Sequence, residues 1–500
     1  MDKLKFRIDI VVAWVAIIAF AAVTGAFVWK ASSAVLFADD WYYLDKVIYP
    51  LMHGQFEWRD LFIKRGAADN AQPLNRLILI AHTELFHMDY AVQGLIGVFF
   101  ALLCVVYLWS INKKFTFSKG RFDLASLLFI SGLGALLLSL NATNIYTWPL
   151  VTTLMFVGLL GLIVLFHFTY RILNLNGGYI RKFALLVALV FVWLIAFDTF
   201  ATIAVLAIFL LLAVNGLGAR DAKRLSVSFA PLLALFLYGR LYAYIFSVQS
   251  QPLSLTRVSH ALSFLITNWK AAWKLLVVPL VSPYYYPTHF AGTVWVAFAA
   301  GAVVCLLVQA WFWLSYFKTE ASEVRFVSAC LMLYSYGTIA GIVVGRVPQF
   351  GIDYIEQPRY VAFYLIQIIA ILLMAFSIIR DEPETTQSVG GKKLASAIMM
   401  ANALFFIVTF MPYARSAWAI IPYVHRYQQA EINKIVEIYE DPGKIPPRCN
   451  TNSITICGWP KSDRAKLTNL LAEYKLNMFN AEFRRRHDFS IQAAAKKTGK

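Results

Sequence analysis

The sequence predicts an all-α fold: a polytopic transmembrane helical bundle of about 11 spans, with helices in its outer-face loops and a small C-terminal periplasmic or extracellular cap. Of the 500 residues, 60% are hydrophobic, whereas soluble domains are about 45–50% apolar. The apolar residues form blocks of roughly 20, the length that crosses a bilayer. Basic residues gather in every second loop between these blocks, the pattern that the positive-inside rule produces.

The predicted spans follow the apolar blocks in chain order. The first block, 10–29, is too long for a signal-peptide core and has no small-residue cleavage site after it, so we expect a retained helix. The run over 183–217 is too long for one span, and a charge at the centre of a lipid-exposed helix is costly. We therefore expect two helices joined by a turn at Asp198. The remaining predicted spans are 90–111, 124–140, 148–170, 227–246, 291–316, 326–345, 360–379 and 394–413.

The distribution of charge predicts the orientation. Basic clusters precede the first block and follow the second, fourth, sixth, eighth and tenth blocks, whereas 141–147 and the turn at Asp198 contain no Lys or Arg. This alternation predicts a multi-pass protein of the cytoplasmic (inner) membrane, with its N-terminus in the cytoplasm. An odd number of spans then places the C-terminus outside, in the periplasm or extracellular space.

This topology divides the chain into two predicted domains. A membrane module covers residues 1–413, and an outer-face tail domain covers residues 414–500. The long outer loops of the module are 30–89, 247–290 and 346–360. The pattern of Asn268 to Leu276 in the second loop predicts an amphipathic helix lying flat on the membrane surface.

The net charge of +17 and the five cysteines support the same interpretation. Much of the basic excess lies in short loops between apolar blocks, so we expect membrane lipids and no nucleic acid as partners. Cys449 and Cys457 are the only cysteines outside the apolar blocks. An oxidising compartment would let them pair, and we predict a disulfide between them.

Two adjacent carboxylates, Asp39 and Asp40, follow the first span among apolar and aromatic residues. Partial burial raises the pKa of a carboxylate, and a neighbour of like charge raises it further. One Asp of the pair could then act as a general base near neutral pH. The alternative is structural, with Asp40 as the N-cap of the following helix.

A second candidate cluster lies between the ninth and tenth predicted spans and contains Arg346, Arg359 and Tyr360. Guanidinium groups bind phosphate bidentately and can stabilise a phosphate leaving group. These residues are therefore candidates for binding a donor phosphate. The alternative is that both arginines extend to lipid headgroups.

A third cluster closes the first outer loop. Lys64 and Arg65 are further candidates for the donor phosphate, and ordinary loop and capping roles are the alternative. No metal-ligand spacing occurs, so no metal site is predicted. The sequence specifies no cofactor, although Mg²⁺ or Mn²⁺ at the acidic pair stays open as an alternative. The candidates for substrate contact are His53, Gln72, Asn75 and Arg76.

An acidic pair directly after the first transmembrane helix, a long outer loop, many spans and an outer C-terminal region together resemble the GT-C superfamily of polytopic glycosyltransferases. The Gly345-Arg346 and Arg359-Tyr360 pairs resemble the Gly-Arg…Arg-Tyr segment of bacterial membrane glycosyltransferases of this layout. Pro358 stands where a small polar residue is more usual. The resemblance covers the layout of the whole chain, but its local sequence only in the first loop and in 346–360.

The resemblance implies a donor and a reaction. The donor would be a polyprenyl-phosphate sugar, and the acceptor a cell-envelope glycan or lipid, with O-antigen, capsule, teichoic-type polymers and lipid A all open. Asp39 or Asp40 would deprotonate the acceptor hydroxyl, and a single displacement would invert the anomeric carbon. A polyprenyl-phosphate sugar synthase and a small flippase are the expected pathway partners. The chain has no WWD-type motif in a large soluble domain, which argues against protein N-glycosylation.

Two other functional classes make different demands on the sequence. A transporter or flippase of a lipid-linked saccharide would need charged or broken helices at the bilayer midplane, often in repeated halves, and no repeat is visible. A membrane acyltransferase would favour a catalytic histidine, and His167 lies at a predicted cytoplasmic helix end without a clear partner. The glycosyltransferase is therefore the favoured hypothesis, and the flippase is the main alternative.

Overall fold

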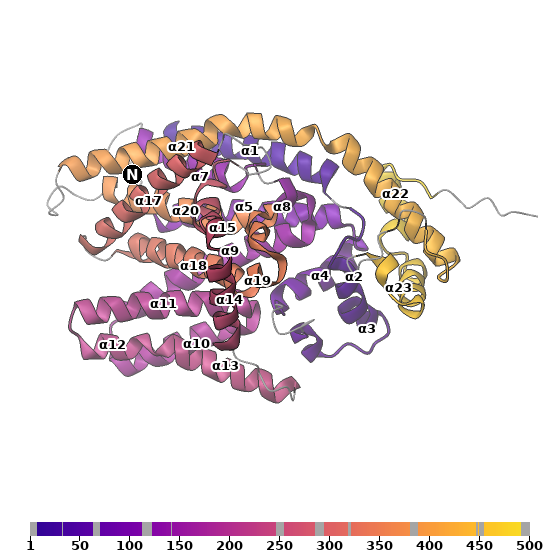
Figure 1. Cartoon of the computed structure of the whole chain (residues 1–500), viewed down its shortest axis with the longest axis horizontal. Coiled ribbons are helices and arrows are strands. Elements are labelled where there is room, and N and C mark those ends of the chain that lie inside the picture. Colours follow the sequence, from indigo (N-terminus) through magenta and orange to yellow (C-terminus); the bar gives the residue numbers. More distant parts are fainter. Residues whose placement is uncertain are drawn as a thin grey trace, which may run out of the picture.

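The described part of the chain is entirely helical (Figure 1). The structure is a computed structural model, and no strand occurs among the residues that it describes. The predicted donor-phosphate residues Lys64 and Arg65 lie outside these residues. The described ranges are 8–32, 34–63, 71–112, 123–141, 143–246, 255–285, 295–318, 322–380, 389–446, 449 and 455–491.

Within the described ranges, ten helices are long and apolar enough to cross a membrane, which confirms the polytopic all-α fold. Uninterrupted apolar runs of this length leave no polar face for water, so packing against other helices and lipid is the only way to cover them. One span combines α12 (Ala222–Ser228) with α13 (Ala230–Phe246). The others are α1 (Ile8–Ala31), α5 (Tyr90–Ile111), α9 (Pro149–Leu173), α10 (Tyr179–Phe197), α11 (Thr199–Gly218), α17 (Trp295–Lys318), α18 (Glu323–Gly345), α20 (Val361–Arg380) and α21 (Val389–Trp418).

The structure differs from the predicted span list in two places. The predicted span at 124–140 is α7 (Leu124–Leu137), which has only 14 residues, against the roughly 20 that cross a bilayer. The second difference lies at Asn268, where α14 (Leu255–Thr267) bends by 100° into a second helical stretch, Trp269–Val281; that this stretch lies flat on the membrane stays a prediction. That stretch contains α15 (Trp269–Ala272) and α16 (Lys274–Val281), whose last five residues are buried. Counting the bent pair as one span gives up to 11.

One end of the bundle, at the right in Figure 1, is covered by helices from two distant parts of the chain, and we call it the capped end. Short connecting helices α8 (Thr143–Thr147), α19 (Val347–Phe350), η5 (Ile352–Glu356) and η6 (Pro358–Tyr360) lie between the spans. The first loop contributes α2 (Asp40–Tyr43), η1 (Leu44–Ile48), α3 (Tyr49–Met52), η2 (Trp58–Phe62) and α4 (Pro73–Phe86). The tail contributes α22 (Ile421–Glu440), η7 (Ile456–Gly458), α23 (Lys461–Glu473), η8 (Asn477–Phe479) and α24 (Ala481–His487).

The tail and the first loop share one hydrophobic core, so the tail is bound firmly to the membrane module. The buried Asn477 donates its side-chain amide to the carbonyls of Ala34 and Met88 at 2.8 and 2.5 Å. These contacts join residues up to 443 positions apart. Lys466 adds an ion pair with Asp45 at 2.6 Å. The first loop therefore completes its core only with residues of the tail.

A second link between tail and loop is the buried carboxylate of Asp89, which caps α5. It pairs with Arg486 at 2.8 Å and with His487 at 2.9 Å. Burial opposes ionisation of Asp89, but the hydrogen bonds and charges of His487 and Arg486 outweigh it and hold the pKa of Asp89 below its ordinary value. The last helix of the tail is thus anchored to the start of a membrane span.

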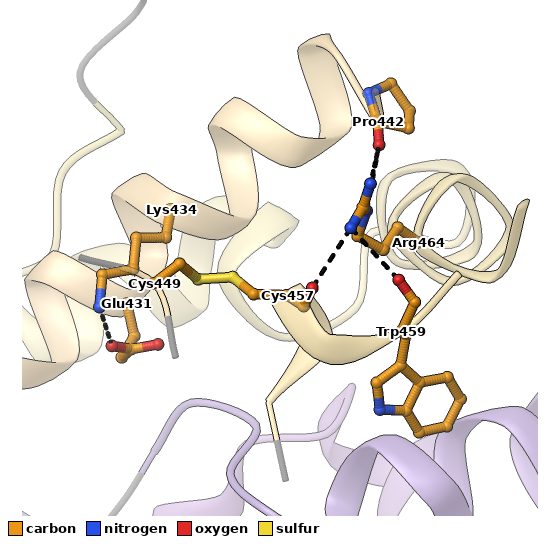
Figure 2. The surroundings of a disulfide bond; sticks show 7 residues. All are labelled: Glu431, Lys434, Pro442, Cys449, Cys457, Trp459 and Arg464. Carbon is orange, nitrogen blue, oxygen red and sulfur yellow. Dashed lines mark hydrogen bonds and ion pairs between the residues drawn. A yellow bond between two sulfur atoms is a disulfide. The ribbon is translucent and has the colours of Figure 1, made fainter. Parts of the chain in front are cut away.

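The tail contains a disulfide between Cys449 and Cys457 (Figure 2), the pair expected from the sequence. Beside it, the buried guanidinium of Arg464 donates to the carbonyls of Pro442, Cys457 and Trp459. One cation therefore satisfies three backbone acceptors in and around η7, and it fixes the chain next to the disulfide.

At the opposite, uncapped end, charged side chains are paired across helices. His167 accepts from or donates to Tyr107 at 2.6 Å, and its other ring nitrogen contacts Glu323 at 2.5 Å. His167 thus has partners that its sequence context did not reveal, and they tie α5, α9 and α18 together. Arg380 of α20 pairs with Asp123, the N-cap of α7. These pairs satisfy charges at helix ends.

Candidate functional site

The candidate site is a cavity of about 450 Å³ at the capped end, where the first loop meets the spans. Its rim is polar, and its inner walls belong to α9, α11, α18 and α20. Five of the predicted site residues line it: Asp39, Gln72, Arg346, Arg359 and Tyr360. The other lining residues are Tyr43, Trp148, Leu150, Val151, Leu154, Met155, Phe200, Ile203, Tyr334, Thr338, Gly341, Ile342, Gly345, Tyr354 and Phe363.

The acidic pair lies on a tight turn that separates its two carboxylates. Ala38 adopts a left-handed conformation with φ 50°, which is uncommon for a residue with a side chain. The turn is closed by the backbone N–H of Asp40, which donates to the carbonyl of Phe37 at 3.0 Å. Asp39 lines the cavity, whereas Asp40 is 1% exposed and does not. The pair therefore offers one carboxylate to the cavity.

Asp40 has a structural partner instead. Its carboxylate accepts a hydrogen bond from the backbone N–H of Phe37 at 2.8 Å, so it bonds back to the preceding turn. Burial raises the pKa of Asp40 well above its ordinary value, Phe37 opposes the rise, and the charge of Asp39 adds to it. The neutral form of Asp40 is thus favoured, and a neutral Asp40 adds no second negative charge beside Asp39.

The 346–360 segment contributes Arg346, Tyr354, Arg359 and Tyr360 to the cavity lining. Arg346 is the C-cap of α18, and a glycine at 351 with φ 88° lets the chain turn into η5. Pro358 opens η6, the short turn that carries Arg359 and Tyr360. A proline at the first helical position fits without strain, because its missing N–H has no partner there. The departure from the usual pattern at 358 is therefore compatible with a well-formed turn.

The two acidic residues of this segment are neutralised by a lysine from another helix. Lys274 of α16 contacts Asp353 at 2.6 Å and Glu356 at 3.6 Å. This clamp also ties the segment to the bent α14–α16 pair. Among the described residues, neither Arg346 nor Arg359 has an acidic partner. Two cations therefore line one cavity with Asp39, and no carboxylate in the described structure forms an ion pair with either of them.

Aromatic rings surround the guanidinium of Arg359. Its carbon lies 5.4–5.9 Å from the ring centres of Trp148, Tyr354 and Tyr360, a distance at which the ring faces attract a cation. Arg359 also donates to the hydroxyl of Tyr354 at 2.6 Å. The Nε of Arg359 and the indole Nε1 of Trp148 are buried and have no hydrogen-bond partner within the described structure. Buried donors rarely lack a partner, so this wall has hydrogen bonds left for a ligand.

The inner part of the cavity is apolar and lies among the membrane-spanning helices. Leu154 and Met155 of α9, Ile203 of α11 and Ile342 of α18 line it. A Cβ added at Gly345 would meet no atom within 4 Å, so the cavity passes directly over this glycine. The cavity is therefore amphipathic, with its polar rim at the capped end and its apolar floor within the bundle.

The other predicted contact residues lie away from the cavity. Arg76 is 1% exposed within α4 and donates to the carbonyls of Asp60 and Ile63. It orders the first loop from within, and the buried Asn75 next to it is likewise absent from the cavity lining. His53 is exposed and stacks on Tyr49 with ring centres 4.1 Å apart. These three side chains therefore have local partners or positions that do not bring them to the cavity.

The sequence reasoning missed Tyr43 and Trp148 as site residues. Tyr43 is one helical turn beyond Asp39, so the i+4 spacing could have indicated it. Trp148 had no such signal, because it enters the site through long-range packing: its ring meets Phe37 edge to face at 5.5 Å. Within the described ranges, no three His, Cys, Asp or Glu side chains gather as a metal site would require.

Comparison with known proteins gives no family. No family model matches the chain, and no curated protein matches it either. The fold and the cavity geometry are therefore the basis for any functional assignment. They establish a multi-pass helical membrane protein with an amphipathic cavity at its capped end.

Proposed function

We propose that the protein is a membrane glycosyltransferase that transfers a sugar from a polyprenyl-phosphate donor to a cell-envelope glycan or lipid acceptor. The observation that carries the proposal is that Arg346 and Arg359, which have no ion pair in the described structure, line the same cavity as Asp39. An anion of the ligand would balance the two cations. A phosphate next to a general base is what this transfer requires.

The shape of the cavity supports a lipid-linked donor. A soluble sugar nucleotide would need polar groups throughout its site, but the inner walls here are aliphatic and aromatic. A polyprenyl phosphate has a charged head and a hydrocarbon chain, and the rim and floor match these two parts. The chain would reach the floor from the bilayer, because the floor lies among spanning helices.

In the proposed mechanism, Asp39 acts on the acceptor and the two arginines act on the leaving group. Asp39 takes the proton of the acceptor hydroxyl, and the acceptor oxygen attacks the anomeric carbon. A new bond forms between that carbon and the acceptor oxygen as the bond to the phosphate oxygen breaks. The phosphate leaves with the electron pair, and Arg346 and Arg359 stabilise its growing charge. With one base and no enzyme nucleophile in this scheme, the anomeric configuration inverts.

The orientation of the reaction follows from the proposed topology. The basic loops predict that the capped end faces the periplasm or the extracellular space. The donor is then made at the cytoplasmic face and must be moved across the membrane, so a polyprenyl-phosphate sugar synthase and a flippase would supply it.

A steric test separates the cavity from the rest of the bundle. Gly345→Leu places a side chain into the open space over Gly345, so we expect loss of donor binding and of transfer. Gly218→Leu is the matched control, since Gly218 also ends a spanning helix with open space around its Cβ. The assay measures binding of a polyprenyl-phosphate sugar in nanodiscs and transfer to acceptor lipids and glycans extracted from the same envelope.

The outcomes distinguish an enzyme from a transporter. Transfer of sugar by wild type and the Gly218 variant, but not by the Gly345 variant, supports the proposal. Movement of the intact lipid-linked sugar between leaflets, with no glycosidic bond made, would replace it with the flippase. Equal transfer by all three proteins would reject the cavity as the donor site.

A further inference from the structure

The turn between α10 and α11 has a strained backbone at a residue that the proposed mechanism does not use. Asp198 has φ 48° and ψ −116°, which lies outside the regions that residues with a side chain normally adopt. It is also 2% exposed. Backbone strain of this kind persists only where surrounding contacts hold it, and it is concentrated at functional sites.

The carboxylate of Asp198 joins three segments that are far apart in the sequence. One oxygen accepts the backbone N–H of Ala71 in the first loop at 3.0 Å. The other oxygen accepts the hydroxyl of Tyr238 in α13 at 2.9 Å. One turn further along α13, the Tyr242 hydroxyl donates to the carbonyl of Phe62 at 3.2 Å. The first loop is thus held against the α10–α11 turn and α13.

The residue after Ala71 is Gln72, which lines the candidate cavity and is 6% exposed. Gln72 is itself left-handed, with φ 51°, and it is the N-cap of α4. Its side-chain direction therefore depends on the peptide that Asp198 holds. On the α11 side, Phe200 lines the same cavity two residues after Asp198.

We propose that Asp198 is a positioning residue for the active cavity: by hydrogen-bonding the backbone of Ala71, it fixes Gln72 at the rim. Its role in catalysis rests on the proposed transferase function, but its structural part does not. Tyr238 contributes to the same role, because its hydroxyl donates a hydrogen bond to the Asp198 carboxylate that accepts from Ala71. Neither residue is among those that line the cavity.

Asp198 and Tyr238 act through hydrogen bonds, so substitutions that keep or remove individual hydrogen bonds can test this role. In Asp198→Asn the amide oxygen can still accept from Ala71, and the amide nitrogen can donate to the Tyr238 oxygen, because a hydroxyl both donates and accepts. Asp198→Ala removes both bonds. Tyr238→Phe removes only one bond and keeps the ring in α13.

The first test needs no activity. Gln72→Cys is labelled in intact membranes with a membrane-impermeant maleimide, and the rate is compared in the Asp198 and Tyr238 backgrounds. We expect slow labelling in wild type and Asp198→Asn, and roughly tenfold faster labelling in Asp198→Ala, as loss of the hydrogen bond from Ala71 to a charged acceptor would give. Tyr238→Phe should lie between. His53→Cys, exposed on the same loop, is the control and should label equally in all backgrounds.

The second test follows donor KM and kcat in the same variants without the cysteine. Asp198→Ala should raise the KM or lower the kcat, and Asp198→Asn should restore wild-type values. Unchanged Gln72→Cys labelling in Asp198→Ala, or an Asn variant that behaves like the Ala variant, would overturn the proposal. If wild type shows no transfer at all, the proposed function fails and the labelling result still decides the role of Asp198. Tyr238→Phe keeps the test valid if Asp198→Ala does not fold.

Discussion

The two ends of the bundle handle charge differently. At the uncapped end, Glu323 contacts His167 and Arg171 at 2.5 and 3.5 Å, and Arg380 pairs with Asp123. At the capped end, Arg346 and Arg359 have no acidic partner among the residues described, although two acids lie close to them in sequence. Those acids, Asp353 and Glu356, are held by a lysine instead.

This difference distinguishes the charged side chains that pair with one another between helices from those that are available to a ligand. A cation with a protein anion beside it is already stabilised and closes a helix end. A cation held among aromatic rings without an anion retains an unsatisfied attraction. This difference supports the proposal that Arg346 and Arg359 bind a phosphate of the ligand, whereas Arg171 and Arg380 hold helices together.

The largest expected effect concerns the acidic pair. Asp39→Asn should lower turnover by roughly 10²–10⁴-fold, the usual contribution of general-base catalysis. Asp40→Asn should leave turnover close to wild type, because its amide oxygen can still accept from Phe37. Transfer is measured in nanodiscs with matched protein amounts. Full activity of the Asp39 variant would show that Asp39 is not the base. Equal loss in both variants would show that Asp39 and Asp40 do not differ in function.

A smaller effect is expected when one arginine from each end of the bundle is replaced by alanine. Arg359→Ala should weaken donor affinity by roughly 10- to 100-fold, since hydrogen bonds to charged groups contribute about 1.5–3 kcal/mol. Arg380→Ala should leave affinity unchanged and cost about 1–2 kcal/mol of stability, between surface and buried ion pairs. Donor binding and thermal melting are measured on both variants. Matching behaviour of the two would show that the ends do not differ in function.

The smallest effect is a pH dependence of stability. Burial raises the pKa of Asp40 in the folded state, so its stabilising contribution is complete below the ordinary carboxyl pKa and is lost as the pH rises towards the raised value. Asp40→Asn cannot ionise, so its melting temperature should fall less than that of wild type between pH 4 and neutrality, a window of about three pH units above the ordinary carboxyl pKa. Parallel melting curves for the two proteins would contradict a buried neutral Asp40.

Much of the membrane part could be predicted, because apolar length depends on the sequence alone. The turn at Asp198 was located from the cost of a charge in lipid, and the structure has a break there. The span at 124–140 was overestimated, since α7 ends at Leu137 and its burial among α1, α20 and α21 replaces contact with lipid. The bend at Asn268 was missed, because a local amphipathic pattern cannot reveal a return into the bundle.

The site was only partly accessible to the same reasoning. Asp39, Arg346 and Arg359 could be chosen by chemistry, and the fold brings them to one cavity. Arg76 was chosen by chemistry too, but two backbone carbonyls of the first loop need its donors. Trp148 joins the cavity through packing against Phe37, a contact across more than a hundred positions that no spacing rule anticipates.

The shared core of the first loop and the tail has a consequence for how the protein is made. Ala34 leaves the ribosome 443 positions before its partner Asn477. Contacts between such distant segments form late, because the intervening chain must first be ordered. The spans can insert one after another during synthesis, but the Phe37–Asp40 turn gains its supporting core only when translation reaches the tail. Ribosome-bound and truncated chains would thus be membrane-inserted but would lack this core, so that the proposed activity would arise only after nearly the whole chain has been synthesised.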